Sequence, residues 1–147
     1  MKKVIYTIDR INRRITMNNK NNKKNLWASP HSPTSEQISE ACGFVFLKDI
    51  NPALQDRLEN SPDNLDSLKE LATELLDFCK ENNCNLYQPA GNPSFQFILG
   101  SLAVVNYLDI DIFYAYSERV SQDVAQPDGS VKKVSVFKHK KFICVKK

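Results

Sequence analysis

The sequence predicts a Rossmann-like three-layer α/β domain with a mostly parallel sheet and a C-terminal antiparallel hairpin. Three observations predict this fold class. Apolar segments of strand length alternate along the chain with helix-period segments. The most apolar segment, 110–116, has six apolar or aromatic residues out of seven, as expected for a strand that is covered on both faces. A helix-period segment, 95–107, precedes it and can form the crossover that a parallel strand requires.

The elements before this strand follow in a regular order. The first strand, 26–29, ends before two closely spaced prolines, which prevent its continuation. Thr34 and Gln37 have the spacing of a capping box, so a helix is expected to begin there and to end near Cys42. The elements expected next are a strand over 43–47, a polar stretch with Pro52 and Pro62, a helix over 63–82, a strand over 85–88 and the helix over 95–107.

The helix over 63–82 has the clearest signal of these elements. Its apolar residues recur at intervals of three and four, which is typical of one buried face, and its acids are expected to face outward. The loop 89–93 consists of turn-forming residues, and Ser94 is expected to cap the helix that follows it.

After the strand over 110–116, the sequence predicts a charged turn at Ser117, Glu118 and Arg119. Two extended segments, 121–126 and 130–137, then flank Pro127-Asp128-Gly129, which is a hairpin signal. Residues 138–145 are expected to extend that edge of the sheet.

The N-terminal residues are expected to form a separate part of the chain. Residues 1–24 read as a basic extension or linker, and the nucleotide-binding domain is expected to span 25–147. Within the extension, 4–8 and 11–17 are candidate strands of a hairpin, and 18–24 is polar low-complexity sequence that cannot supply a core.

Charge is distributed unevenly along the chain. Residues 1–24 carry eight Lys or Arg against one acid, residues 130–147 carry seven Lys and no acid, and residues 25–129 carry five basic residues against sixteen acidic ones. The basic ends suit an anionic partner such as nucleic acid or a nucleotide. They suit equally well a solvated tail and an edge strand that lysines protect from aggregation.

Cysteines and apolar runs indicate the compartment. The four cysteines form no Cys-x-x-Cys pair, and only His31 and His139 could join them, so no metal site is expected. Four cysteines without a signal peptide fit free thiols in a reducing cytoplasm. No apolar run reaches the roughly 20 residues of a membrane span, so no membrane partner is expected.

Three loops are expected at the carboxyl ends of strands, where open α/β sheets bind ligands. They are 29–34, 88–94 and 117–120, and two of them open helices whose free N–H groups favour an anion. The candidate side chains are His31, Ser32, Gln88, Asn92, Ser94, Glu118 and Arg119. This set suits a phosphate or a nucleotide better than a metal-dependent reaction.

Each candidate also has a structural interpretation. The chain contains no Gly-x-Gly-x-x-Gly, Walker or Gly-x-Ser-x-Gly motif. His31 can be an ordinary turn residue. Glu118 and Arg119 can be a surface ion pair, and His139 an exposed strand residue. Arg119 is the only arginine after Arg57, which favours a role as anion anchor.

Five short motifs along the chain resemble, in content and order, those of the small CRISPR-associated Rossmann-like (CARF-like) ring nucleases of type III systems. The motifs are Ser29 to Gln37, Gln88 to Phe95, Tyr116 to Val120, Asp128-Gly129 and Phe137 to Phe142. The resemblance covers 25–145, and Ser-Glu-Arg-Val with Phe-Lys-His is its most specific part. The chain departs from the family pattern in the turn 88–94 and in the residues after Phe142.

The resemblance implies a function and an assembly. It implies a homodimer that binds a cyclic oligoadenylate second messenger across its two-fold axis and switches off the antiviral signal. Cleavage would need no metal or cofactor, because a ribose 2′-OH attacks the adjacent phosphodiester and the protein positions and stabilises charge. The resemblance implies catalytic roles for His31, Glu118, Arg119 and His139, and ligand-binding roles for Ser29, Ser32, Gln88, Gly91, Asn92, Ser94, Ser117 and Lys138.

Two other functions fit the same residues. One is a non-catalytic binder that sequesters or senses the cyclic nucleotide. The other is a small interaction protein whose basic ends hold RNA or another protein.

Overall fold

The computed structural model describes residues 22–146. The candidate strands over 4–8 and 11–17, and nearly all of the expected N-terminal extension, lie outside these residues. The first described strand, β1, begins at Lys24.

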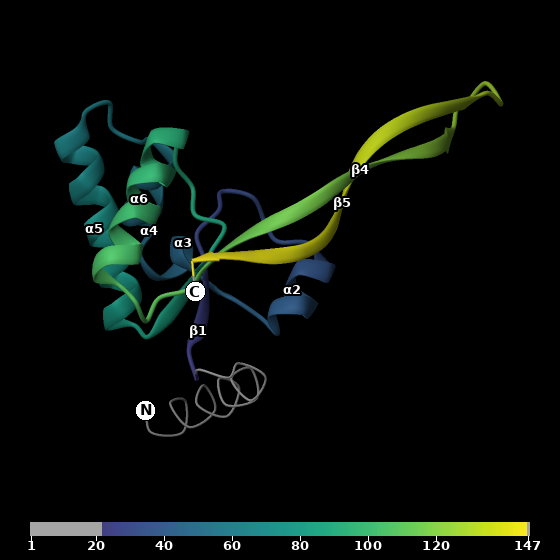
Figure 1. The fold of residues 1–147 in the computed structure, drawn as a ribbon. Helices are drawn as coiled ribbons and strands as arrows, with labels where there is room; N and C mark the ends of the chain where they lie inside the picture. The colour runs from purple at the N-terminus through teal and green to yellow at the C-terminus, as the bar shows by residue number, and fades with distance from the viewer. Residues whose placement is uncertain (1–21, 147) are drawn as a thin grey trace.

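The predicted fold class is confirmed. One sheet of five strands has the order β2-β1-β3-β4-β5, in which the first four are parallel and β5 is antiparallel to β4. The elements in chain order are β1 Lys24–Trp27, α2 Ser35–Ala41, β2 Val45–Phe46, α3 Leu47–Ile50, α4 Pro52–Glu59, α5 Leu65–Glu81, β3 Cys84–Tyr87, α6 Pro93–Asn106, β4 Ile112–Ala125 and β5 Val131–Lys146. In Figure 1, α4, α5 and α6 lie on one side of the sheet and α2 on the other.

The two faces of the sheet pack against different partners. Leu26, Leu86 and Ile112 point to the helices α4, α5 and α6 and belong to the main core. Trp27 and Tyr87 point the other way and form an aromatic cluster with Ala41 of α2. Because strand residues alternate between faces, neighbouring residues reach both cores. We call these faces the α6 face and the α2 face.

The helix signals in the sequence are largely confirmed. Thr34 and Gln37 form both hydrogen bonds of the capping box at the start of α2. The acids of α5 are exposed, as expected. The cap of α6 was predicted wrongly, because Asn92 rather than Ser94 accepts the first-turn hydrogen bond. The stretch after β2, read from the sequence only as polar, contains the two short helices α3 and α4, and Asn51 caps the second of them.

The predicted charged turn at 117–119 is wrong. The strand β4 continues through these residues to Ala125 and pairs with β5 along its whole length. Pairing with β3 ends at Phe113, so among residues 22–146 no other strand lies beside the outer part of β4 and β5. Figure 1 shows it as a long twisted arm that projects from the domain. The predicted hairpin is therefore the tip of this arm, and its chain reversal lies at Pro127–Gly129 as expected.

Within 22–146, no helix is long and apolar enough to cross a membrane.

Candidate functional site

The candidate site lies where the chain connections of the sheet diverge. β1 and β3 are neighbours, but β1 leads through α2 to β2 on one side, and β3 leads through α6 to β4 on the other. Ligands of open α/β sheets bind at such a switch point, outside the carboxyl ends of the strands. A hollow of about 570 Å³ lies there, lined by Ser29, Pro30, His31, Glu59, Gln88, Pro89, Ala90, Gly91 and Asn92. We call it the switch-point pocket.

The loop after β1 is held through its backbone. The Ser29 hydroxyl accepts a hydrogen bond from the His31 N–H at 3.2 Å, and the His31 carbonyl accepts one from Trp27 Nε1 at 2.7 Å. The His31 imidazole is exposed and lines the pocket. The loop is therefore held through main-chain atoms of His31, and the imidazole is left free of that role.

The loop after β3 is fixed by Gln88, which has a left-handed backbone with φ of 49°. Its N–H donates to the Phe113 carbonyl at 2.8 Å, and its side-chain oxygen accepts from the Ala115 N–H at 2.7 Å. Gln88 thus ties the pocket to β4 at the point where parallel pairing ends. Gln88 also lines the pocket.

The start of α6 forms another part of the pocket wall. Asn92 Oδ1 accepts from the Phe95 N–H at 2.9 Å, and the Asn92 N–H donates to Ser61. Gly91 has φ of 132°, and a Cβ there would lie 2.3 Å from the Phe95 ring, so the turn requires glycine. Within the described part of the chain, no hydrogen bond occupies the N–H groups of Gly91 and Ser94. These two donors lie at the positive end of the helix dipole.

A buried glutamine on α4 is hydrogen-bonded to residues at the pocket. Gln55 is 4% exposed, and its amide nitrogen donates to the Ala28 carbonyl and to Glu59, each at 3.1 Å. Among the described residues nothing donates to Gln55 Oε1. Buried polar atoms without a partner are uncommon and often lie near functional sites. Sequence reasoning missed both Gln55 and Glu59, because they lie on the unpredicted helix α4.

The candidates on the arm point to opposite faces. Glu118 lies opposite Lys138 on the α6 face and pairs with Lys140 at 3.3 Å. Arg119 lies on the α2 face, with its guanidinium 5.2 Å from the centre of the Phe137 ring. The expected turn would have put both side chains at one ligand. The observed strand separates them, because successive residues of a strand alternate between faces.

His139 is a buried residue of the α2 face rather than an exposed strand residue. Its side chain is 4% exposed, and Nε2 lies 3.1 Å from Glu40 Oε1 on α2. The other Glu40 oxygen accepts from the Phe142 N–H at 2.6 Å. Ser117 faces His139 across the strand pair. Glu40 thus joins α2 to the base of the arm, beside a β-bulge between Tyr116 and Ser117.

The base of the arm adds an aromatic and cationic surface next to the switch-point pocket. Tyr116, 44% exposed, follows directly after Ala115, the hydrogen-bond partner of Gln88. Lys141 lies opposite Tyr116, and Lys138 follows two pairs further along the same face. Two residues before Tyr116, the Tyr114 hydroxyl donates a hydrogen bond to Gln96 Oε1, and burial raises the pKa of Tyr114 to about 12. Tyr116 and Lys141 were not among the sequence candidates. Alternation alone would put Lys138 and Lys141 on opposite faces, and the β-bulge that leaves Lys140 without a partner in the register brings them to the same one.

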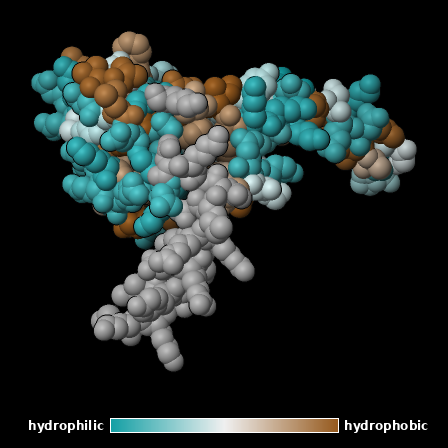
Figure 2. All heavy atoms as spheres, turned by 60° about the horizontal axis from the view of Figure 1, so that its bottom comes forward, coloured by the Kyte–Doolittle hydropathy of each residue, from teal (hydrophilic) through white to brown (hydrophobic). Residues whose placement is uncertain are grey.

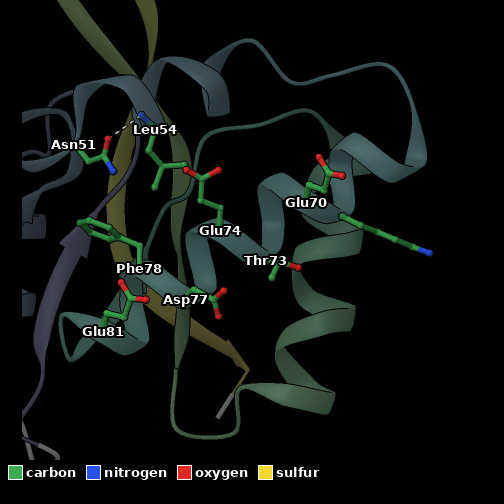
Figure 3. Close-up of a pocket in the computed structure, with 9 residues that line it drawn as sticks. Asn51, Leu54, Glu70, Thr73, Glu74, Asp77, Phe78 and Glu81 are labelled. Atoms are coloured by element: carbon green, nitrogen blue, oxygen red, sulfur yellow. Dashed lines mark hydrogen bonds between the residues drawn. The ribbon is translucent and has the colours of Figure 1, made fainter.

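A larger hollow, of about 630 Å³, lies among the helices and has a different character. Glu70, Glu74, Asp77 and Glu81 follow one another on α5 and border it (Figure 3). Glu74 pairs with Arg57, and Asp77 accepts a hydrogen bond from Tyr107. Within residues 22–146 no group of His, Cys, Asp or Glu has an arrangement that could hold a metal ion. These acids therefore form a solvated helix face.

The chain belongs to the family described as the Uncharacterized protein MJ1673 family, because the family model matches residues 23–143. The match covers every element of the described fold except the last three residues of β5. A search of curated proteins found no match, and a search of solved structures found none.

Proposed function

We propose that this chain binds a cyclic oligoadenylate second messenger at the switch-point pocket, as a sensor or sequestering protein. The observation that carries the proposal is the convergence of the two loops after β1 and β3. It brings five of the residues expected at the ligand, Ser29, His31, Gln88, Gly91 and Asn92, into the wall of one pocket. The choice of cyclic oligoadenylate rests on the motif resemblance to CARF-like ring nucleases.

The pocket suits a phosphodiester that is held by hydrogen bonds. The unoccupied N–H groups of Gly91 and Ser94 at the start of α6 favour an anion. The side-chain amides of Gln88 and Asn92 add neutral donors. Lys and Arg are absent from the residues that line the pocket, so the positive charge for a polyanion must come from beside it.

The base of the arm supplies that charge and a stacking surface. Lys138 and Lys141 lie on β5 beyond the register of Ala115, the residue of the arm that is hydrogen-bonded to Gln88 in the pocket wall. Tyr116 between them and the pocket offers an aromatic ring on which a base can stack, an interaction of about 1–3 kcal/mol per base. A ligand of several nucleotides would then place one phosphate at α6 and the next units along the arm.

Cleavage by a metal-independent ring nuclease mechanism is the second candidate function, favoured by the exposed His31 imidazole in the pocket wall. A neutral imidazole there can accept the proton of a ribose 2′-OH as it attacks the adjacent phosphorus, with the leaving 5′-oxygen protonated by solvent. The products would be a 2′,3′-cyclic phosphate and a 5′-OH. The other expected catalytic residues support this less, because Arg119 and His139 lie on the α2 face.

Binding and product analysis in the presence of EDTA test both functions. The wild-type chain is incubated in excess over cyclic tetra-adenylate or hexa-adenylate, bound ligand is measured by retention on a filter, and products are separated by chromatography. Retention of intact ligand supports the binder, and a 2′,3′-cyclic phosphate that disappears in His31→Ala supports cleavage. Absence of retention and of product for both rings refutes the proposed function.

Charge variants test the position of the ligand. Lys138→Gln and Lys141→Gln should each weaken binding about ten- to hundred-fold, and the double variant by about the product of the two losses, since each charge-assisted contact to phosphate contributes roughly 1.5–3 kcal/mol. The matched control is Lys132→Gln with Lys133→Gln near the tip of the same arm, which removes the same charge away from the pocket. Equal losses in the two double variants would show that only the total charge of the arm matters.

A further inference from the structure

The helix α6 has apolar side chains on its exposed side as well as on its buried side. None of its 14 residues is charged. Phe95, Leu99 and Ala103 form its buried side. A helix that is hydrophobic all round is normally covered all round. The other side of α6 is nevertheless exposed.

The exposed side of α6 forms a stripe of mainly apolar residues. Phe97, Ser101 and Val104 follow one another at intervals of four and three, so they share one face of the helix, and Leu108 lies in the turn just after it. Phe97 is 77% exposed, Val104 55% and Leu108 71%. Beside the stripe, a groove of about 390 Å³ separates α6 from β5 and is lined by Gln96, Phe97, Gly100, Ser101, Val104, Ile112, Tyr114, Val145 and Lys146. Nothing in residues 22–146 covers the stripe.

Gly100 lies at the middle of this surface, and within residues 22–146 no close packing requires a glycine there. A Cβ added to Gly100 would meet no atom within 4 Å. Glycine weakens the interior of a helix relative to alanine, so its place here calls for another explanation. The pair Gly100 and Ser101 is the lowest point of the stripe, where another helix can approach closely.

We propose that a second copy of this chain covers the stripe and forms a two-fold dimer through α6. A two-fold axis that passes Gly100 and Ser101 places Phe97 of one copy against Val104 of the other, because the two residues lie equally far from that pair. The contact between Phe97 and Val104 then occurs twice in the dimer, once on each side of the axis, as an isologous interface requires. The edge residues Ile143 and Val145, 41% and 58% exposed, extend the contact onto β5.

The area of the surface fits a dimer of ordinary size. Fully exposed side chains of these types present roughly 60–120 Å² each, so the exposed parts of Phe97, Val104, Val105, Leu108, Ile143 and Val145 together offer roughly 220–450 Å² per copy. An interface of standard size takes about 800 Å² per partner, of which somewhat more than half is apolar. The stripe therefore supplies most of the apolar part. The lack of charge on α6 matches the charge-depleted centre of such interfaces.

Sedimentation or light scattering of the full chain without ligand tests this dimer. The wild-type chain is expected to be a dimer at micromolar concentration, and Phe97→Glu and Val104→Glu are each expected to shift it to a monomer. Phe137→Glu is the matched control, since Phe137 is 71% exposed but lies on the arm. Circular dichroism shows whether each variant retains its helices.

Two outcomes overturn the proposal. A monomeric wild-type chain would leave the stripe to another occupant, such as residues 1–21 or a different protein. A dimer that survives both α6 variants, or that only Phe137→Glu dissociates, would place the contact elsewhere. Because no nucleotide enters the experiment, its result is independent of the proposed function.

Discussion

Replacing Glu40 with alanine should loosen the attachment of α2 to the base of the arm. The Glu40 carboxylate accepts from the Phe142 N–H at 2.6 Å and lies 3.1 Å from His139 Nε2, on a strand about one hundred residues away in sequence. A hydrogen bond to a charged group contributes about 1.5–3 kcal/mol. Because Glu40 is 38% exposed, the lower value applies, and the two bonds together contribute about 3 kcal/mol.

Urea unfolding measures this loss. The Glu40→Ala midpoint should fall while the slope of the transition stays the same, and the melting temperature should fall by about 8–12 °C. Glu40→Gln retains one acceptor for the Phe142 N–H and should lose about half as much. Glu36→Ala is the matched control, because it removes the same charge from an exposed position on the same helix. If Glu40→Ala is as stable as Glu36→Ala, the carboxylate does not hold the arm and the interpretation of His139 as a structural residue is refuted.

Two further predictions concern the pocket and its support. Gly91→Ala should lower stability by about 1–3 kcal/mol, because φ of 132° and the Phe95 ring exclude a Cβ, whereas Gly100→Ala should leave the fold of the single chain intact; equal thermal stability of the two variants at a concentration at which both are monomeric would contradict the turn geometry. Tyr114 ionises near pH 10 when unfolded and near pH 12 when folded, so the stability it contributes is complete below about pH 10 and declines as the pH rises toward 12. Urea midpoints between about pH 9 and 11 should fall less steeply for Tyr114→Phe than for the wild type, and parallel slopes would show that Tyr114 does not titrate as proposed.

Local signals predicted the parallel part of the fold. Thr34 and Gln37 specify the start of α2 because both halves of a capping box lie within one helical turn. The three- and four-residue spacing of leucines in α5 predicts one buried face, and the structure buries that face. The same reasoning found the loops after β1 and β3, since apolar strands that end in turn residues fix the carboxyl edge. Five expected ligand residues therefore line the observed pocket.

The errors come from tertiary contacts that local patterns do not report. The charged residues Glu118 and Arg119 interrupt an apolar run, and this pattern predicts a turn. The same pattern also occurs where a strand continues beyond the sheet and is exposed on both faces, as β4 does. Only the partner strand, with Lys138 and Phe137 opposite them, shows that pairing continues. The burial of His139 depends on Glu40, and no sequence spacing links residues so far apart.

The lysines near the C-terminus divide into two groups that sequence alone treats as one. Lys146 is 6% exposed, and its ammonium donates to the carbonyls of Tyr107, Leu108 and Ile110, so it closes the turn between α6 and β4. It cannot attract an anionic partner from solution.

The basic residues of the arm itself give it a net positive charge. Residues 116–141 carry six basic side chains and three acidic ones, a net charge of +3, although residues 25–129 taken together are strongly acidic. Figure 2 shows the arm as a largely hydrophilic projection. A polyanion is therefore repelled by the helical layer and attracted along the arm toward its base, where Lys138 and Lys141 lie. The pocket lining itself contains several hydrogen-bond donors, no Lys or Arg, and one acid, Glu59. A nucleotide chain has the matching division between charged phosphates and neutral bases. Raising the salt concentration should then weaken binding of the wild type more steeply than binding of the Lys138→Gln, Lys141→Gln double variant, and equal salt slopes would refute attraction along the arm.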